Sequence, residues 1–150
     1  MCVLGIDPGL ANTGWAVIRR RRYVASGVIK TRPKELRAVR LQKVSSALVA
    51  IAIAHDIEQV AMETLFGGKR RIHHTAEMLG AIRLSLWNAG YMVFDIAPAQ
   101  AKAAVGHRSA AKKGKVAEGV ARALNINVAR MANHETDACA IALAYIGGKK

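Results

Sequence analysis

The sequence has few of the features that cross-link secreted proteins or anchor membrane proteins. Its only cysteines are Cys2 and Cys139, so we expect no disulfide framework, and this count suits a reducing compartment. No apolar run reaches about 18 residues, and the longest, at 47–54, is broken by His55 and Asp56, so no membrane span is expected. The first residues lack the basic and apolar segments of a secretory signal.

Acidic residues are also scarce. Lys and Arg number 23 against 10 Asp and Glu, which gives a net charge of +13. A hydrophobic fraction of 52% and a mean hydropathy of +0.14 exclude a disordered basic tail. A compact cationic domain attracts polyanions, and nucleic acid is the leading partner because its phosphates release counterions to Lys and Arg. The alternative, that the charge only maintains solubility, stays open.

The hydrophobic periodicity predicts one α/β domain over residues 1–150, because linkers, repeats and low-complexity segments are lacking. Three strands joined by short turns should form an antiparallel meander, and later strands alternating with helices should add in parallel. The first helix is expected to begin near Pro33 and to bury Leu36, Val39, Val44, Leu48 and Ile51. Strands are expected at 3–7, 13–18, 23–29, 59–63 and 91–96, and further helices at 72–89, from Pro98, at 115–124 and at 133–146.

Several of the few acids occupy unexpected places. Asp7 and Glu63 each close an apolar strand, and Asp137 lies on an apolar helix one turn after His134. A buried carboxylate is costly unless it is paired, so each acid either pairs with a nearby Arg or serves a site. Sites in α/β sheets form at the carboxyl ends of strands, where these acids would gather. Such oxygen ligands suit Mg²⁺ or Mn²⁺, and two such ions can promote phosphodiester hydrolysis.

The order of short motifs along nearly the whole chain resembles that of RuvC-type Holliday-junction resolvases. The first motif is LGIDPG at 4–9 with TGW at 13–15, and the second is VAMETLF at 60–66. The next helix carries LG at 79–80 with Arg83. The third block is APAQAK at 97–102, followed by VG at 105–106 and Lys112, and the last is HETDACAIA at 134–142.

This resemblance implies a ribonuclease H-like fold, with a mixed five-stranded sheet flanked by helices. It implies a structure-selective DNA endonuclease that resolves four-way junctions by symmetric cleavage with two Mg²⁺ or Mn²⁺ ions. Matched by position, Asp7, Glu63 and Asp137 would be catalytic metal ligands, and His134 stands where the family usually has an acid. The resemblance also implies a homodimer, and we expect the face of Met78, Leu79, Ile82 and Leu86 to form its interface.

Further residues are expected to act on the DNA. Lys102 and Lys112 match basic residues near the scissile phosphate, and Phe66 matches an aromatic residue against an unstacked base, although Phe66 as a core residue remains an alternative. The other expected DNA contacts are Lys69, Arg70, Arg71, Arg83 and Lys115. The basic run at 19–22 is interpreted as a solvated hairpin turn, with DNA contact left open.

Two other functions remain open on the sequence alone. One is a related ribonuclease H-like nuclease acting on branched DNA or structured RNA, and the other is a non-catalytic nucleic-acid-binding module. A branch-migration motor is a possible partner. We expect a cytoplasmic, nucleoid-associated protein, with a viral or organellar source left open.

Overall fold

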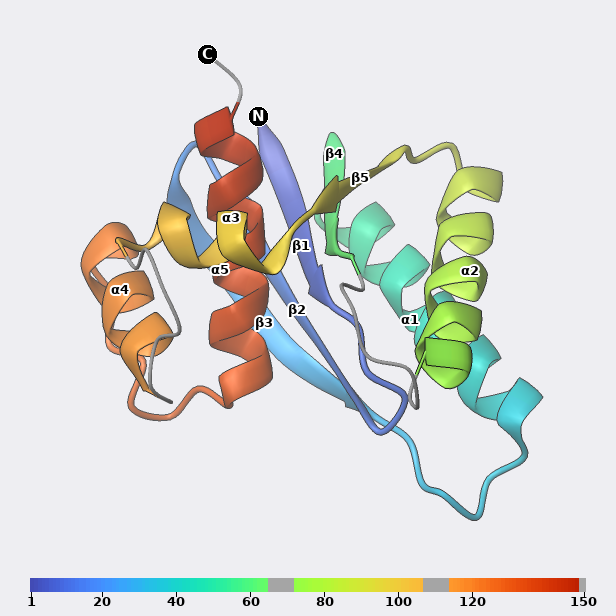
Figure 1. Cartoon of the computed structure of the whole chain (residues 1–150). Coiled ribbons are helices and arrows are strands. Elements are labelled where there is room, and N and C mark those ends of the chain that lie inside the picture. Colours follow the sequence, from blue (N-terminus) through green and yellow to red (C-terminus); the bar gives the residue numbers. More distant parts are fainter. Residues whose placement is uncertain (65–71, 107–113, 149–150) are drawn as a thin grey trace.

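A computed structural model describes residues 1–64, 72–106 and 114–148, with the side chains of 72–74 left out of the description. Helices lie on both faces of one sheet, as Figure 1 shows. The strands are β1 (Cys2–Asp7), β2 (Asn12–Arg19), β3 (Arg22–Lys30), β4 (Gln59–Glu63) and β5 (Val93–Ile96). The helices are α1 (Arg37–Ala54), α2 (Ile72–Asn88), α3 (Pro98–Ala104), α4 (Lys115–Leu124) and α5 (Asn133–Gly148).

The sheet has the strand order β3-β2-β1-β4-β5. The first three strands pair antiparallel, and β4 and β5 add in parallel beside β1. The mixed sheet expected from the sequence is therefore confirmed. Because β1 and β4 are parallel neighbours, their carboxyl ends meet at the same edge of the sheet.

Alternation along β1 divides its side chains between two cores. Leu4 and Ile6 join the core under α1 and α2, whereas Val3 joins the core under α3, α4 and α5. Gly5 and Asp7 share the face of Val3. Strand β4 behaves in the same way, since Met62 faces α1 and α2 and Ala61 faces α5. The terminal acids of both strands therefore project on the side of α5.

Helix α5 lies directly on β1 and β2 because two glycines leave room for its backbone. A Cβ atom on Gly5 would overlap the carbonyl oxygen of Ala138, and one on Gly14 would overlap the carbonyl oxygen of His134. Most of α5 is buried, including Ala138, the thiol-bearing Cys139 and the residues around them. The apolar sequence of this helix thus reflects burial between the sheet and the neighbouring helices α3 and α4.

The structure corrects the expected start of the first helix. Helix α1 begins at Arg37, four residues after Pro33, so Pro33 is outside its first turn. Leu36 and Val39 are 76% and 46% exposed, although Val44 and Leu48 are buried as expected. The buried residue in the first turn is instead Arg40, whose guanidinium binds polar groups of the neighbouring loops. A hydrophobic pattern alone did not reveal this polar anchor.

The face of α2 that was expected at a dimer interface belongs to the core. Met78, Ile82 and Leu86 are fully buried and Leu79 packs beside them, against residues of α1 and of the sheet. That part of the sequence interpretation is wrong, because periodicity identifies a buried face without identifying what covers it. Strand β5 is also shorter than expected, beginning at Val93.

The described helices include none that is both long and apolar enough to cross a lipid bilayer.

We predict that Gly5→Ala destabilises the protein by about 1–3 kcal/mol, because the added methyl group forces α5 away from β1. Thermal and urea unfolding measure the loss. Gly147→Ala, which lies on α5 itself, is the control, since a Cβ there meets nothing within 4 Å. Equal stability of the Gly5→Ala and wild-type proteins would contradict the close contact between α5 and the sheet.

Candidate active site

Two acids from neighbouring strands form the base of the candidate site. Asp7 ends β1 and Glu63 ends β4, and the register pairs Ile6 with Met62 just before them. Both side chains lie on the α5 side of the sheet. The expectation that these strands are neighbours is therefore confirmed.

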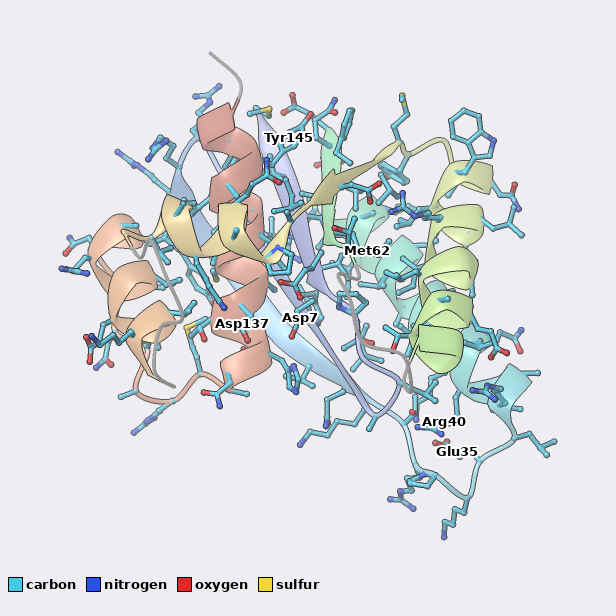
Figure 2. The ribbon with its side chains drawn as sticks, in the orientation of Figure 1. Asp7, Glu35, Arg40, Met62, Asp137 and Tyr145 are labelled. Carbon is cyan, nitrogen blue, oxygen red and sulfur yellow. The ribbon has the colours of Figure 1, made fainter. Side chains whose placement is uncertain are left out.

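Helix α5 supplies the other two groups. The Nδ1 atom of His134 lies 2.6 Å from Oδ2 of Asp7. The backbone carbonyl of His134 lies over Gly14, which is the register partner of Asp7 on β2. Asp137 follows one helical turn later, and Figure 2 shows its carboxylate beside Asp7, between α5 and β1. The three-residue spacing on a helix thus brings both residues to the strand ends, as the sequence predicted.

Glu135 has a structural position, away from the acids of the site. One carboxylate oxygen accepts the backbone N–H of Ala132 at 2.8 Å, which caps α5, and the other accepts the hydroxyl of Ser26 on β3 at 2.7 Å. The Ser26 hydroxyl also lies 3.0 Å from that of Tyr23. Glu135 therefore fixes the start of α5 against the sheet and holds its two neighbouring site residues in place.

The buried guanidinium of Arg40 stabilises the loop that follows Asp7. Arg40 donates from Nε to the hydroxyl of Thr31 at 2.9 Å and from a terminal nitrogen to the carbonyl of Leu10 at 3.1 Å. The Thr31 hydroxyl donates to the same carbonyl, and the Thr13 hydroxyl donates to the carbonyl of Gly9 at 2.8 Å. These bonds order the chain that leaves Asp7, and nothing in the hydrophobic pattern predicted them.

Burial and mutual repulsion make the three carboxylates hard to ionise together. Burial, then the charges of Asp7 and Asp137, raise the pKa of Glu63 to about 7. Burial, then Asp7, raise the pKa of Asp137 to about 6, although His134 and Lys102 oppose the rise. Burial also raises the pKa of Asp7, against the hydrogen bond and charge of His134. The cluster therefore favours an added positive charge.

Lys102 supplies part of that charge from helix α3. It shares a hollow of about 190 Å³ with Glu63 and Asp137, and its ammonium opposes the rise in both of their pKa values. The remaining walls come from Pro98, Ala101, Val116 and Ala140, which were not among the predicted site residues. The structure thus places Lys102 beside Glu63 and Asp137.

The donor set fits a hard divalent cation. Carboxylate oxygens with one imidazole are ligands that Mg²⁺ or Mn²⁺ accepts. Burial, then repulsion by neighbouring carboxylates, raises the pKa values of Glu63 and Asp137, and a bound cation would oppose that rise. Among the described residues, no group of three His, Cys, Asp or Glu side chains has the arrangement needed to hold a metal ion. Asp7 is instead turned towards His134, so cation binding requires the side chains to close around the ion.

Two of the other predicted DNA contacts, Arg83 and Lys115, lie in the described part of the chain, and neither lines the hollow beside the acids. Arg83 on α2 is ion-paired with Asp95 of β5, and its contact with DNA remains a prediction. Lys115 is exposed at the first residue of α4. The predicted residues that lie outside the described part of the chain are Phe66, Lys69, Arg70, Arg71 and Lys112.

Cys139 packs in the hydrophobic core and is not part of the acidic cluster. Its side chain is buried in the core, and burial, then Glu135, raise the pKa of its thiol to about 12. The thiolate is therefore disfavoured, as expected for an inert packed cysteine.

A mixed five-stranded sheet with acids at the carboxyl ends of β1 and β4 and on the crossing helix defines a ribonuclease H-like nuclease domain. The chain belongs to the RuvC family of crossover junction endodeoxyribonucleases, whose sequence profile matches residues 3–145. It is therefore a nuclease of a family that depends on divalent metal.

Relatives of this family match the chain over its length. It is 33% identical to the RuvC protein of Chlorobium phaeovibrioides, with 100% of this chain and 85% of that protein covered. It is 34% identical to that of Pelodictyon phaeoclathratiforme, with 100% and 83% covered. The structure of Thermus thermophilus RuvC aligns with a TM-score of 0.86 at 29% identity, and that of the same protein in complex with Holliday junction substrate with 0.87 at 30%. Each covers 97% of this chain and 93% of the other.

We predict that the metal-free protein loses thermal stability as the pH rises from about 5 to about 8. The native cluster binds protons with pKa values of about 7 for Glu63 and about 6 for Asp137, above their ordinary values of 4.5 and 3.8, so the native state holds more protons than the unfolded state in this range. Melting temperatures in EDTA measure the fall, and Mg²⁺ should raise the melting temperature most at the higher pH.

Two variants determine whether this dependence comes from the cluster. Glu63→Gln should flatten the pH dependence and reduce the effect of Mg²⁺, whereas Glu118→Gln, at an exposed site on α4, should change neither. If both variants kept the wild-type pH dependence, the acids at the sheet edge would not be its source.

Proposed function

We propose that this protein resolves four-way DNA junctions by symmetric phosphodiester cleavage with two divalent metal ions. The observation that carries the proposal is the meeting of Asp7, Glu63 and Asp137 at one edge of the sheet, where burial raises all three pKa values and repulsion by neighbouring carboxylates adds to the rise for Glu63 and Asp137. The solved relative in complex with Holliday junction substrate supports the choice of substrate.

The metal ligands in this proposal are Asp7, Glu63, Asp137 and His134, and the ions are Mg²⁺ or Mn²⁺. When bound, such ions supply activation of the attacking water and stabilisation of the leaving oxygen. His134 stands at a position where carboxylates prevail in the family, and its imidazole nitrogen is a ligand that suits Mn²⁺ better than Mg²⁺. Its bond to Asp7 also orients that carboxylate before any cation binds.

The protein's own groups prepare the phosphate for attack. Lys102 projects into the hollow beside Glu63 and Asp137, where its ammonium offsets the negative charge of an incoming phosphodiester. The carboxylates are half-buried and so only partly exposed to bulk water, and the capped start of α5 keeps His134 and Asp137 in place. Hydrolysis then joins the water oxygen to phosphorus and breaks the bond from phosphorus to the leaving oxygen.

Residues beyond the cluster would distinguish a junction from duplex DNA. We assign Phe66 to stacking on an unpaired base, and Lys112 to the scissile phosphate beside Lys102. Stacking of a base on an aromatic ring contributes about 1–3 kcal/mol without regard to sequence. Lys69, Arg70, Arg71, Arg83 and Lys115 would contact phosphates. These roles rest on the match of motifs with the family.

We predict that Asp7→Asn lowers junction cleavage by at least about 10³-fold and leaves junction binding in EDTA within about twofold of wild type, because a neutral amide replaces a charged ligand. Cleavage of a synthetic four-way junction is measured with Mg²⁺, Mn²⁺ or EDTA, beside duplex, single-stranded DNA and RNA controls.

The matched control is Asp56→Asn, which removes an exposed acid after α1, outside the cluster, and should retain cleavage. Full activity of a folded Asp7→Asn protein would contradict the assigned site. Equal cleavage of RNA and junction would favour a ribonuclease H-like nuclease with another substrate.

We also propose that the chain acts as a homodimer, because two symmetric incisions require two clusters and each chain carries one. The surface available for a second copy lies on the side of α2 away from its core face. Leu84, Trp87 and Met92 are 62%, 65% and 60% exposed there. They border a hollow of about 450 Å³, whose lining is completed by Gly80, Arg83, Tyr91 and Val93.

The spacing on α2 suits a helix-to-helix contact. Gly80, Leu84 and Trp87 recur every three or four residues and so form one stripe. A Cβ at Gly80 would meet nothing within 4 Å in this chain, which leaves room for a partner's backbone. Large exposed apolar side chains in one patch are typical of protein interfaces, and tryptophan contributes strongly to them.

We predict that Trp87→Asp converts the protein to a monomer of about half the native mass, weakening association by about 30-fold or more. Sedimentation at micromolar concentration measures the change, and paired incision of one junction should decline with it. Ile53→Asp is the control, since Ile53 is 61% exposed on α1 outside this surface. A wild-type monomer, or an unchanged Trp87→Asp dimer, would contradict the interface.

We also propose that a branch-migration motor is a further partner and that the protein is located in the cytoplasm beside the nucleoid. Both proposals rest on the family resemblance and on the positive charge of the chain.

A further inference from the structure

The turn between β2 and β3 carries side chains that its backbone does not favour. Arg19 pairs with Arg22 across the hairpin, so Arg20 and Arg21 form a two-residue loop. Both have a positive φ, 50° and 62°, as a type I′ turn requires. Asn-Gly is the favoured pair in this turn, because side chains with a full Cβ are strained in the left-handed region. Residues that conflict with their local structure are typical of functional sites.

The four arginines of this arginine hairpin, residues 19–22, are exposed. Arg19 donates to the carbonyl of His55 at 2.8 Å and to the sulfur of Cys2 at 3.5 Å. Within the described ranges, Arg20, Arg21 and Arg22 take part in no ion pair. Four adjacent guanidinium groups repel one another, and the nearby acids Asp56 and Glu58 interact with Arg19. Turn geometry therefore does not account for the run of four arginines.

The arginine hairpin also borders a hollow of about 550 Å³. Its lining consists of Arg19, Arg20, Arg22, Tyr23 and Val24. Guanidinium groups are planar donors that bind phosphate oxygens in pairs, and a concave cationic surface concentrates an anionic ligand. The hollow therefore suits a chain of phosphates.

The arginine hairpin lies at the end of the sheet opposite the acidic cluster. Cys2 pairs with Arg19 and Asp7 pairs with Gly14, so the length of β1 separates the two ends, roughly 17 Å at 3.4 Å per residue. The backbone N–H of Arg20 donates to the carbonyl of Met1, and Figure 1 shows this turn near the N-terminus. Phosphates bound here cannot be those held at Asp7 and Glu63.

We propose that the arginine hairpin is a second DNA contact, which binds the phosphate backbone of a duplex segment away from the cleavage site. The inference rests on the proposed function, because a bound junction tethers four duplex arms and so raises the local concentration of phosphate around the protein. That tethering, with a net charge of +13, favours DNA over an acidic protein surface as the ligand. The contact reads no sequence, because phosphates carry none.

The test replaces the turn by one that its backbone favours. Arg20→Asn combined with Arg21→Gly removes two charges and relieves both strained positions, so the melting temperature should rise by about 2–4 °C. Binding of duplex and of uncleaved junction in EDTA should weaken by about 10-fold at low salt. The plot of log affinity against log salt should become shallower by about 2, one per lost phosphate contact.

Two matched variants isolate the site. Arg20→Lys with Arg21→Lys keeps both charges and should keep the wild-type salt dependence. Arg32→Gln with Lys34→Gln removes two exposed charges after β3, at the other end of that strand, and should reduce duplex affinity less than twofold. Arg21→Gly alone should give half of the change in slope.

Several results would overturn the proposal. One is an unchanged salt slope in the Arg20→Asn and Arg21→Gly protein, and another is an equal loss in the Arg32→Gln and Lys34→Gln protein. Displacement of duplex by polyglutamate at lower concentration than by competing duplex would assign the arginine hairpin to an acidic protein instead.

Cleavage distinguishes this proposal from the proposed function. With Mg²⁺ and saturating enzyme, the Arg20→Asn and Arg21→Gly protein should cut a junction at the wild-type rate, since the acidic cluster is untouched. If the wild-type protein cut no junction yet showed the expected difference in duplex binding, the proposed function would fail and the arginine hairpin would stand.

Discussion

The contact between α5 and the sheet, with no side chain between their backbones, determines the geometry of the candidate site. Gly5 and Gly14 allow the helix to lie on β1 and β2, and the His134 carbonyl then stands over Gly14, whose register partner is Asp7. Asp7 and Asp137 meet for that reason alone, although 130 residues separate them in sequence. A larger residue at either glycine would displace the helix that carries half of the cluster.

The same burial that stabilises the fold makes the carboxylates of the cluster costly to ionise. Alternation along β1 and β4 places Asp7 and Glu63 on the face that α5 covers, so their carboxylates lose water as the core forms. Desolvation is the largest cause of the raised pKa of each acid, and repulsion by neighbouring carboxylates comes second for Glu63 and Asp137. Lys102 and His134 offset only part of this cost, and a divalent cation is suited to offset the rest.

The sequence predicted the elements and the acids because both follow from periodicity and position. Strand ends at Asp7 and Glu63 and the one-turn spacing of His134 and Asp137 are local properties. What was missed depends on tertiary contacts. Arg40 occupies a buried site that Leu36 and Val39 were expected to share, because its partners, Thr31 and Leu10, come from other segments. The face of α2 was identified correctly as apolar, but α1 and the sheet cover it. The contacts of Glu135 depend likewise on β3.

The two ends of the central strands carry opposite charge, and this polarity bears on how a polyanion approaches. The acidic edge repels phosphate until cations occupy it, so DNA affinity without divalent metal must come from basic surfaces such as the arginine hairpin at residues 19–22. Since β1 fixes the distance between the ends, cation binding at Asp7 changes the charge of one end and leaves the other unaltered. In the proposed arrangement, binding of the distant duplex segment and cleavage are therefore separable, because the arginine hairpin and the proposed metal ligands occupy different ends of the same strands.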